Sequence, residues 1–257
     1  MISSNEHLPL GILVPMHEEV EQLLKEIENA RITSYAARTF YSGTLSGKEV
    51  ILAQSGIGKV AASFTAALLI HHFNVKALVV SGVAGGISDS AEVGDLAIAQ
   101  EAVQHDMDCR PLFPQFLIPH SGISHYQTDP ALTKKIEEAA FNFIQEDFQH
   151  QIPSLVQLEL GISTPSIHKG LLVSGDQFIG TSGQLSKIQK ELPETLFVEM
   201  EGAAVAQICH DSDIPFCSVR TISDKANDVA HLDFNKFLNE AAKIYTAGII
   251  KKFAAFL

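Results

Sequence analysis

The stretch from residue 195 to residue 224 constrains the possible fold most strongly. It opens with a short apolar run at residues 196–198, which is too short for a helix and predicts a buried strand. Two carboxylates, Glu199 and Glu201, follow on either side of Met200, and a helical pattern of apolar residues begins at Ala203. Strong local polarity directly after a buried strand is typical of a ligand-binding edge.

A second strand is predicted at residues 215–222, and Ser223 and Asp224 close it. Strand, helix and strand then follow each other within about 30 residues, which is the size of a βαβ unit. Because both strands of such a unit run parallel, we expect Glu199, Glu201 and Asp224 at the same carboxyl edge of a sheet, where open α/β folds bind ligands.

Other predicted strands also end in polar or glycine-rich residues. The acidic pair Glu18 and Glu19 follows a strand at residues 10–14, and three glycines follow a strand at 77–80. Residues 169–173 form another predicted strand, which ends at Gly175-Asp176. If these strands are neighbours, their carboxylates and glycine backbone converge on one cleft.

The remaining pattern predicts a single α/β domain over residues 1–257, since no linker, repeat or low-complexity tract interrupts it. Residues 41–45 and 49–54 predict a hairpin, and residues 155–160 a further strand. One amphipathic helix is expected from Asp233 to the end of the chain. The proline-rich segment 110–126 predicts an irregular functional loop, either a lid or an interface.

Composition excludes several classes of protein. The formal net charge of −12 and the lack of a Lys/Arg run argue against a nucleic-acid binder or a protein of anionic membranes. Three cysteines fit neither a disulfide framework nor a metal motif, and they favour a reducing, cytoplasmic location. The N-terminus lacks a signal-peptide pattern, and no membrane span is predicted. His105, Asp106 and Asp108 match no familiar ligand spacing, so no metal is expected.

Converging carboxylates without a basic cluster suit a substrate that becomes cationic in its transition state. Cleavage of a glycosidic bond is such a reaction, because the sugar acquires oxocarbenium character while an acid protonates the leaving group and a base activates water.

Six motifs, in order along the chain, resemble those of one enzyme family. They are Met-His-Glu-Glu-Val at 16–20, Ser-Gly-Ile-Gly-Lys-Val at 55–60, Ser-Gly-Val-Ala-Gly-Gly at 81–86, Ser-Gly-Asp-Gln-Phe-Ile at 174–179, Val-Glu-Met-Glu at 198–201 and Arg-Thr-Ile-Ser-Asp at 220–224. Together they resemble the 5′-methylthioadenosine/S-adenosylhomocysteine nucleosidases of the purine nucleoside phosphorylase superfamily. The resemblance implies a three-layer α/β domain with a central mixed, largely parallel sheet, a homodimer without a cofactor, and a part in methionine salvage.

The resemblance also implies roles for individual residues. Glu19 would activate the attacking water and Asp224 would protonate N7 of the departing adenine. Glu201 would bind the ribose hydroxyls, with Met200 against the sugar. The other expected site residues are Phe178, which would stack on the base, Ile179, whose backbone would contact the edge of the base, Gly85, Arg220 and Ser223, which would line the site, and Phe234, which would border the 5′ group. Val83 stands where the family motif often has serine, so a hydroxyl near the sugar is missing.

Three functions remain open at this point. The first is hydrolysis of a 5′-substituted adenine nucleoside: methylthioadenosine, S-adenosylhomocysteine or the aminodeoxyfutalosine of menaquinone synthesis. The second is a phosphate-dependent purine nucleoside phosphorylase, which Glu18 and Glu19 disfavour because they would repel a phosphate dianion. The third is a noncatalytic nucleoside-binding or interaction protein, which the presence of all three carboxylates disfavours.

Overall fold

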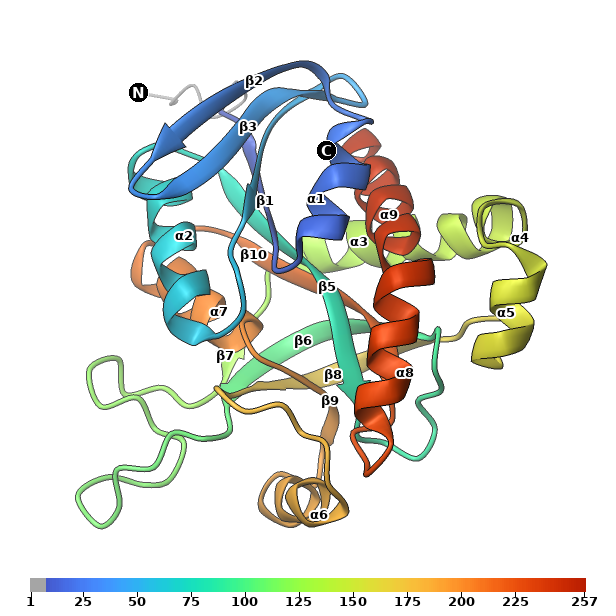
Figure 1. The fold of residues 1–257 in the computed structure, drawn as a ribbon. Helices are drawn as coiled ribbons and strands as arrows, with labels where there is room; N and C mark the ends of the chain where they lie inside the picture. The colour runs from blue at the N-terminus through green and yellow to red at the C-terminus, as the bar shows by residue number, and fades with distance from the viewer. Residues whose placement is uncertain (1–7) are drawn as a thin grey trace.

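The computed structural model describes residues 8–257, apart from the side chain of Leu232. The prediction that the N-terminus carries no signal peptide therefore falls partly on residues 1–7, outside the described residues. The chain forms a mixed α/β domain in which helices cover both faces of a central sheet (Figure 1). Helices α1, α3 and α9 pack on one face, and α2 and α7 on the other, so the expected three layers are present.

The described strands form one ten-stranded sheet. They are β1 (Leu10–Val14), β2 (Glu28–Tyr35), β3 (Arg38–Leu45), β4 (Lys48–Gln54), β5 (Ala77–Gly86), β6 (Leu96–Gln104), β7 (Tyr126–Gln127), β8 (Ile167–Ser174), β9 (Thr195–Glu199) and β10 (Phe216–Asp224). The helices are α1 (His17–Leu24), α2 (Lys59–His71), α3 (Pro130–Asn142), α4 (Phe148–Gln151), α5 (Ser154–Leu160), α6 (Ser182–Glu191), α7 (Gly202–Asp211), α8 (Ala230–Phe237) and α9 (Lys243–Ala255). Two π-helical turns, Phe143–Asp147 and Leu238–Ala242, join helical segments.

Strand β5 organises the sheet because it pairs with three strands. It lies parallel to β1 and β10 and antiparallel to β9. Since β10 also pairs with β6, the order β5-β10-β6-β8-β9 closes on itself. Parallel and antiparallel pairings both occur, and the sheet is therefore mixed, as expected.

The prediction that β9, α7 and β10 form a βαβ unit with two parallel strands is wrong. The two strands are not neighbours, and they run in opposite directions relative to β5, because β9 is antiparallel and β10 parallel to it. Their carboxyl ends nevertheless meet, since Val198 of β9 and Asp224 of β10 both register with Gly85.

Two further predictions need correction. Residues 155–160 form helix α5 and not a strand: only Val156 is buried, and Gly161 ends the helix in a left-handed conformation. The expected C-terminal helix is interrupted, because α8 and α9 are separated by the π-helical turn. The hairpin of β3 and β4 and the strand β8 are confirmed.

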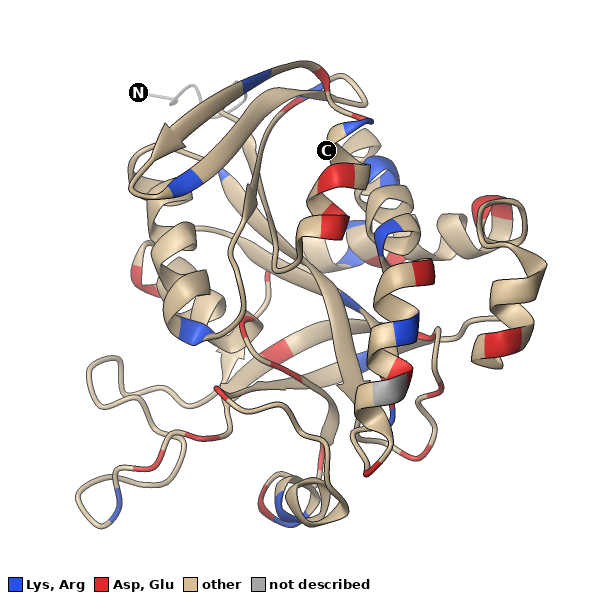
Figure 2. Ribbon diagram, in the orientation of Figure 1, with Lys and Arg blue, Asp and Glu red and all other residues tan. Residues whose placement is uncertain are grey.

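Of the three apolar cores formed by the described residues, the two larger lie on opposite faces of the sheet, and the third packs α6 against β8 and β9. The first packs α1, α3 and α9 around residues such as Tyr245 and Phe253, and the second packs α2 and α7 around Phe197. Lysines and arginines are interspersed with acidic residues over the elements drawn in Figure 2. Within residues 8–257, no helix is both long and apolar enough to cross a bilayer.

Candidate active site

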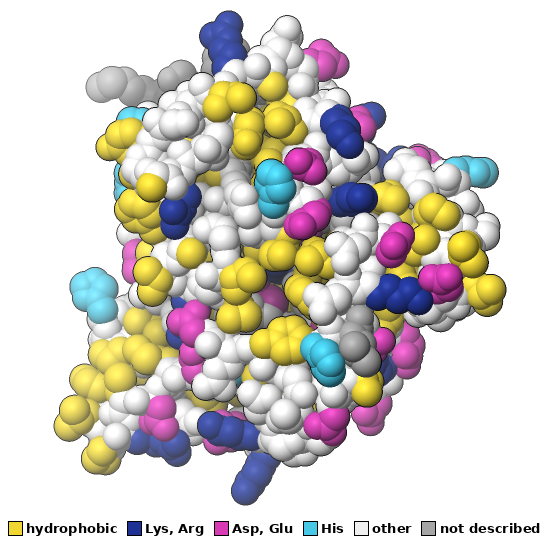
Figure 3. All heavy atoms as spheres, in the orientation of Figure 1, with side chains coloured by type: hydrophobic (Ala, Val, Ile, Leu, Met, Phe, Trp, Pro, Cys, Tyr) yellow, Lys and Arg dark blue, Asp and Glu magenta, His cyan; other side chains and the backbone are white. Residues whose placement is uncertain are grey.

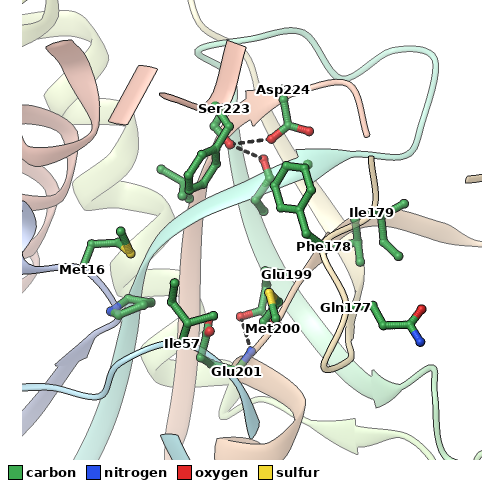
Figure 4. Close-up of a pocket in the computed structure, with 16 residues that line it drawn as sticks. Met16, Ile57, Gln177, Phe178, Ile179, Glu199, Met200, Glu201, Ser223 and Asp224 are labelled. Carbon is green, nitrogen blue, oxygen red and sulfur yellow. Dashed lines mark hydrogen bonds between the residues drawn. The ribbon is translucent and has the colours of Figure 1, made fainter. Parts of the chain in front are cut away.

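A cavity of about 340 Å³ lies at the ends of β5, β9 and β10 (Figure 4). In the space-filling view, hydrophobic side chains surround a hollow near the middle of the face shown (Figure 3). Eight of the predicted site residues line this cavity: Gly85, Phe178, Ile179, Met200, Glu201, Ser223, Asp224 and Phe234. The other two, Glu19 and Arg220, are buried and are not among its lining residues.

Gly85 is the point at which the two strand ends meet. A Cβ atom at this position would lie 3.0 Å from Oδ1 of Asp224 and 3.2 Å from Cβ of Ala226. Contacts this close would displace the loop that follows β10, so a glycine keeps Asp224 against the sheet.

Asp224 is held by two donors although it is only 2% exposed. Its Oδ1 accepts the Ala226 N–H at 2.8 Å, and its Oδ2 lies 2.8 Å from the Ser223 hydroxyl. That hydroxyl also lies 3.3 Å from the carbonyl oxygen of Ala84, and its single hydrogen can serve only one acceptor at a time. Burial raises the pKa of Asp224 above its ordinary value, which favours a carboxyl that carries a proton.

Glu199 anchors the floor of the site. Its carboxylate accepts the backbone N–H groups of Glu201 and Gly202 at the start of α7, where the helix dipole favours a negative charge. The Ser174 hydroxyl and the Arg220 guanidinium also donate to it. These donors hold the Glu199 side chain in place beside Arg220.

Arg220 occupies space that another glycine leaves open. A Cβ atom on Gly82 would lie 2.6 Å from Nη1 of Arg220. The guanidinium is 1% exposed and also lies 3.6 Å from Oε2 of Glu201. One buried cation therefore faces two carboxylates, so the guanidinium balances the negative charge of Glu201 only in part.

Glu201 projects into the cavity from the residue before α7. Its Oε1 accepts the Gly58 N–H at 2.9 Å, which ties it to the loop before α2. Burial, followed by the nearby Glu199 carboxylate, raises the pKa of Glu201 well above its ordinary value. A carboxyl here can bind a pair of hydroxyl groups, since it accepts from both when it is ionised and can donate to one when it is protonated.

Glu19 lies in the first turn of α1, and its side chain is completely buried. Its carboxylate accepts the Thr246 hydroxyl at 2.9 Å and the Met16 N–H at 3.3 Å. Burial raises the pKa of Glu19 to about 7, against the opposing effects of Thr246 and Arg220. A carboxyl that titrates near neutrality is suited to accept a proton from water.

The rest of the cavity wall is apolar. Phe178 and Phe234 meet edge to face, with ring centroids 5.6 Å apart, and Phe178 keeps 43% of its surface exposed. Met16, Ile57 and Met200 supply further apolar surface. An exposed aromatic face beside buried carboxyls can stack on a flat heterocycle and hold its polar sugar below.

Several lining residues were given no role from the sequence: Met16, Ile57, Gln177, and Glu199, which was expected at the ligand-binding edge without a task of its own. All four lie inside the six motifs, so the motifs marked the right segments without identifying each side chain. Val83 also lines the cavity and gives it a methyl surface at this position. No residue of the segment 110–126 is among the described residues that line it.

Within residues 8–257, no group of three or more His, Cys, Asp or Glu side chains is arranged to hold a metal ion. The two aspartates beside His105 are engaged elsewhere: Asp106 with Lys59 at 2.6 Å, and Asp108 with Arg110.

Comparison with known proteins identifies the family. The family model described as the phosphorylase superfamily matches residues 9–255. A 5′-methylthioadenosine/S-adenosylhomocysteine nucleosidase from Staphylococcus haemolyticus is 36% identical over 235 residues, which cover 91% of this chain and 94% of that protein. The chain belongs to the 5′-methylthioadenosine/S-adenosylhomocysteine nucleosidase family of the phosphorylase superfamily.

Solved structures of this nucleosidase family agree with the assignment. The Neisseria meningitidis 5′-methylthioadenosine/S-adenosylhomocysteine nucleosidase in complex with methylthio-immucillin-A has a TM-score of 0.86 at 31% identity, covering 97% of this chain and 99% of that chain. The Streptococcus pyogenes S-adenosylhomocysteine nucleosidase in complex with 5-methylthiotubericidin has a TM-score of 0.84 at 28% identity, covering 99% of both chains. The nucleoside phosphorylase-like fold expected from the sequence is thus confirmed.

Proposed function

We propose that this protein hydrolyses the N-glycosidic bond of 5′-substituted adenine nucleosides, releasing adenine. Methylthioadenosine and S-adenosylhomocysteine are the first substrates to test, because the relatives carry those names. One observation supports the proposal most: a single cavity presents Glu201 and Asp224, both with raised pKa values, beneath an exposed aromatic ring, and Glu19 is buried close by.

The proposed reaction assigns one task to each carboxyl. As the C1′–N9 bond breaks, Asp224 delivers a proton to N7 of the adenine. Glu19 takes a proton from the water whose oxygen bonds to C1′, and this requires that water reach its carboxylate from the cavity. Glu201 binds the ribose hydroxyls, and the Glu199–Arg220 pair keeps it in place. Positioned acids and bases contribute about 10²–10⁴ in rate each.

The apolar wall supports the remaining assignments. Phe178 stacks on the adenine and the backbone of Ile179 contacts the edge of the base, while Met200 packs against the sugar. Phe234 borders the 5′ substituent. A thioether substituent suits this apolar surface, whereas a charged one would have to extend toward solvent.

We also propose that residues 1–257 act as one catalytic domain within a homodimer. Val60 is 80% exposed, and Leu112 of the loop 110–126 is 82% exposed. Figure 1 places α2 and this loop on the same side of the molecule. Pairing with a second copy would bury this apolar surface. Sedimentation of a fully active monomer at micromolar concentration would overturn the dimer.

The location that we propose is the cytoplasm, and the role is methionine salvage. Support for the location comes from the three free cysteines, Cys109, Cys209 and Cys217, which suit a reducing compartment.

The experiment that tests the function is a substrate panel. The purified protein is incubated with methylthioadenosine, S-adenosylhomocysteine, aminodeoxyfutalosine and adenosine, each with and without millimolar phosphate, and adenine is quantified. Release of adenine without phosphate supports the hydrolase. Failure to release adenine from any 5′-substituted nucleoside would refute it, and a sugar 1-phosphate product would instead identify a phosphorylase.

A further inference from the structure

The Glu19 carboxylate is oriented by a side chain from the other end of the chain. The Thr246 hydroxyl, on α9, donates to Oε1 of Glu19 at 2.9 Å, and both side chains are buried, at 2% and 0% exposure. The other hydrogen bond to this carboxylate, from the Met16 N–H at 3.3 Å, is longer. The charged groups that act on Glu19 are Arg220 of β10 and Glu18 of its own helix.

A second hydroxyl, in a longer contact, supports this direction of the Thr246 hydroxyl. Ser81, which belongs to the same strand as Gly85, donates to Oγ1 of Thr246 at 3.4 Å. Because Oγ1 accepts from Ser81, the hydrogen of Thr246 is left to point at Glu19. A threonine inside a helix commonly directs its hydroxyl to the carbonyl four residues earlier, but here the donated bond crosses to another element.

A π-helical turn precedes α9 and changes the face on which Thr246 lies. Leu238–Ala242 has a wider turn than an α-helix, and the extra residue rotates everything that follows by about 100°. The residues on either side of Thr246 cannot replace it. Tyr245 packs against Phe143, Phe148 and Phe237, and Ala247 has no hydroxyl.

We propose that Thr246 is a positioning residue, whose hydroxyl holds the Glu19 carboxylate in the orientation that accepts a proton from the attacking water. The inference rests on the proposed function, because it assigns Thr246 to the base of that reaction. A threonine that merely fills space would contribute its methyl group and its volume, and valine would reproduce both.

Removing the hydroxyl makes two separate changes to Glu19. The carboxylate loses the shorter of its two hydrogen bonds, so its rotamer is less restricted. It also loses a donor that favours the ionised form over the neutral form. A hydrogen bond to a charged group is strong enough to change the pKa of that group by about one to two units. The acid limb of the pH profile of kcat/KM reports the pKa of the base in the free enzyme, and it therefore moves to higher pH.

The test compares wild type, Thr246→Val and Thr246→Ser in kcat/KM for methylthioadenosine from pH 5 to pH 9.5. We expect Thr246→Val to lose about tenfold or more at pH 6, to recover part of that loss at pH 9 and to keep the alkaline limb unchanged. Thr246→Ser keeps the hydroxyl and should restore the wild-type acid limb. Thermal unfolding is measured on every variant, and Thr246→Ala replaces the valine variant if that protein does not fold.

A matched control uses the Glu19→Gln background, in which there is no base to orient. Adding Thr246→Val to Glu19→Gln should reduce the residual activity by less than about twofold. An unchanged acid limb in Thr246→Val, or a serine variant as impaired as the valine variant, would overturn the inference. Neither outcome would affect the proposed function, which fails only if wild type releases no adenine.

Discussion

Replacing Glu19 by glutamine should make the stability of the folded protein less sensitive to alkaline pH while it removes the proposed base. Burial raises the pKa of Glu19 from the ordinary 4.5 to about 7. Between these two values, the folded protein binds more protons at this site than the unfolded chain does. The free energy of unfolding of wild type therefore falls as pH rises through this window, and glutamine, which does not titrate, avoids the loss.

The size of the effect follows from the two pKa values. They differ by about 2.5, and each pKa unit corresponds to about 1.4 kcal/mol, so full ionisation of Glu19 costs about 3 kcal/mol. At pH 5 the unfolded chain is already partly ionised at this site. The stability difference between Glu19→Gln and wild type should therefore grow by roughly 2–3 kcal/mol between pH 5 and pH 9, with most of the change below about pH 7.5.

The assay is urea unfolding at several pH values and one fixed protein concentration. The pH-independent cost of the glutamine amide beside the Met16 N–H cancels when the same variant is compared across pH. Glu201 and Asp224 are present in both proteins, so their own titrations largely cancel as well. Glu138→Gln, at an exposed position of α3, is the control and should show no comparable trend. A stability difference that stays constant from pH 5 to pH 9 would refute the raised pKa of Glu19.

The remaining predictions concern the reaction. Asp224→Asn should lose at least about 10²-fold in kcat on methylthioadenosine, because an amide cannot protonate N7. On a nitrophenyl riboside, whose leaving group needs no proton, Asp224→Asn should regain much of that loss, while Glu19→Gln should not. Equal impairment of the two variants on that substrate would show the division of roles to be wrong. Glu201→Gln should raise KM and lower kcat together, since it removes a group that binds the sugar hydroxyls in the ground state and stabilises the positive charge that develops on the sugar in the transition state. An effect confined to kcat in steady-state kinetics would argue against that role. Millimolar phosphate should leave the rate of adenine release unchanged. A rate that rises with phosphate concentration would contradict the proposal that water, and not phosphate, attacks the sugar.

Much of the site was predictable from the sequence because its residues follow buried strands. Apolar runs such as those of β5, β9 and β10 identify strands without any knowledge of their neighbours, and the polar residues after them mark the ligand edge. The pairing order was not predictable in this way. The antiparallel contact of β9 with β5 joins strands that are distant in the sequence and closes the order β5-β10-β6-β8-β9, which no local pattern encodes. The βαβ expectation therefore failed, although the carboxylates still converge.

The other errors have equally local causes. Residues 155–160 alternate apolar and polar side chains like a strand, but Pro153 and Gly161 bound a short helix with two exposed leucines. Strand β2 was not predicted because every residue in it is exposed, and no apolar periodicity marks it. Thr246 had no distinguishing signal, since its contact with Glu19 joins residues 227 positions apart.

The junction at Gly85 separates the parts of the site that are fixed from the parts that can move. Asp224 and the strand that leads to Glu201 are both registered on the same residue of β5, so thermal motion carries the acid and the sugar-binding group together. Phe178, by contrast, lies on a loop and is partly exposed, and Phe234 lies on the short helix α8. Slow steps of turnover, such as the departure of adenine, should then depend on solvent viscosity through the two aromatic rings. The spacing between the proton donor and the sugar should stay the same from one turnover to the next.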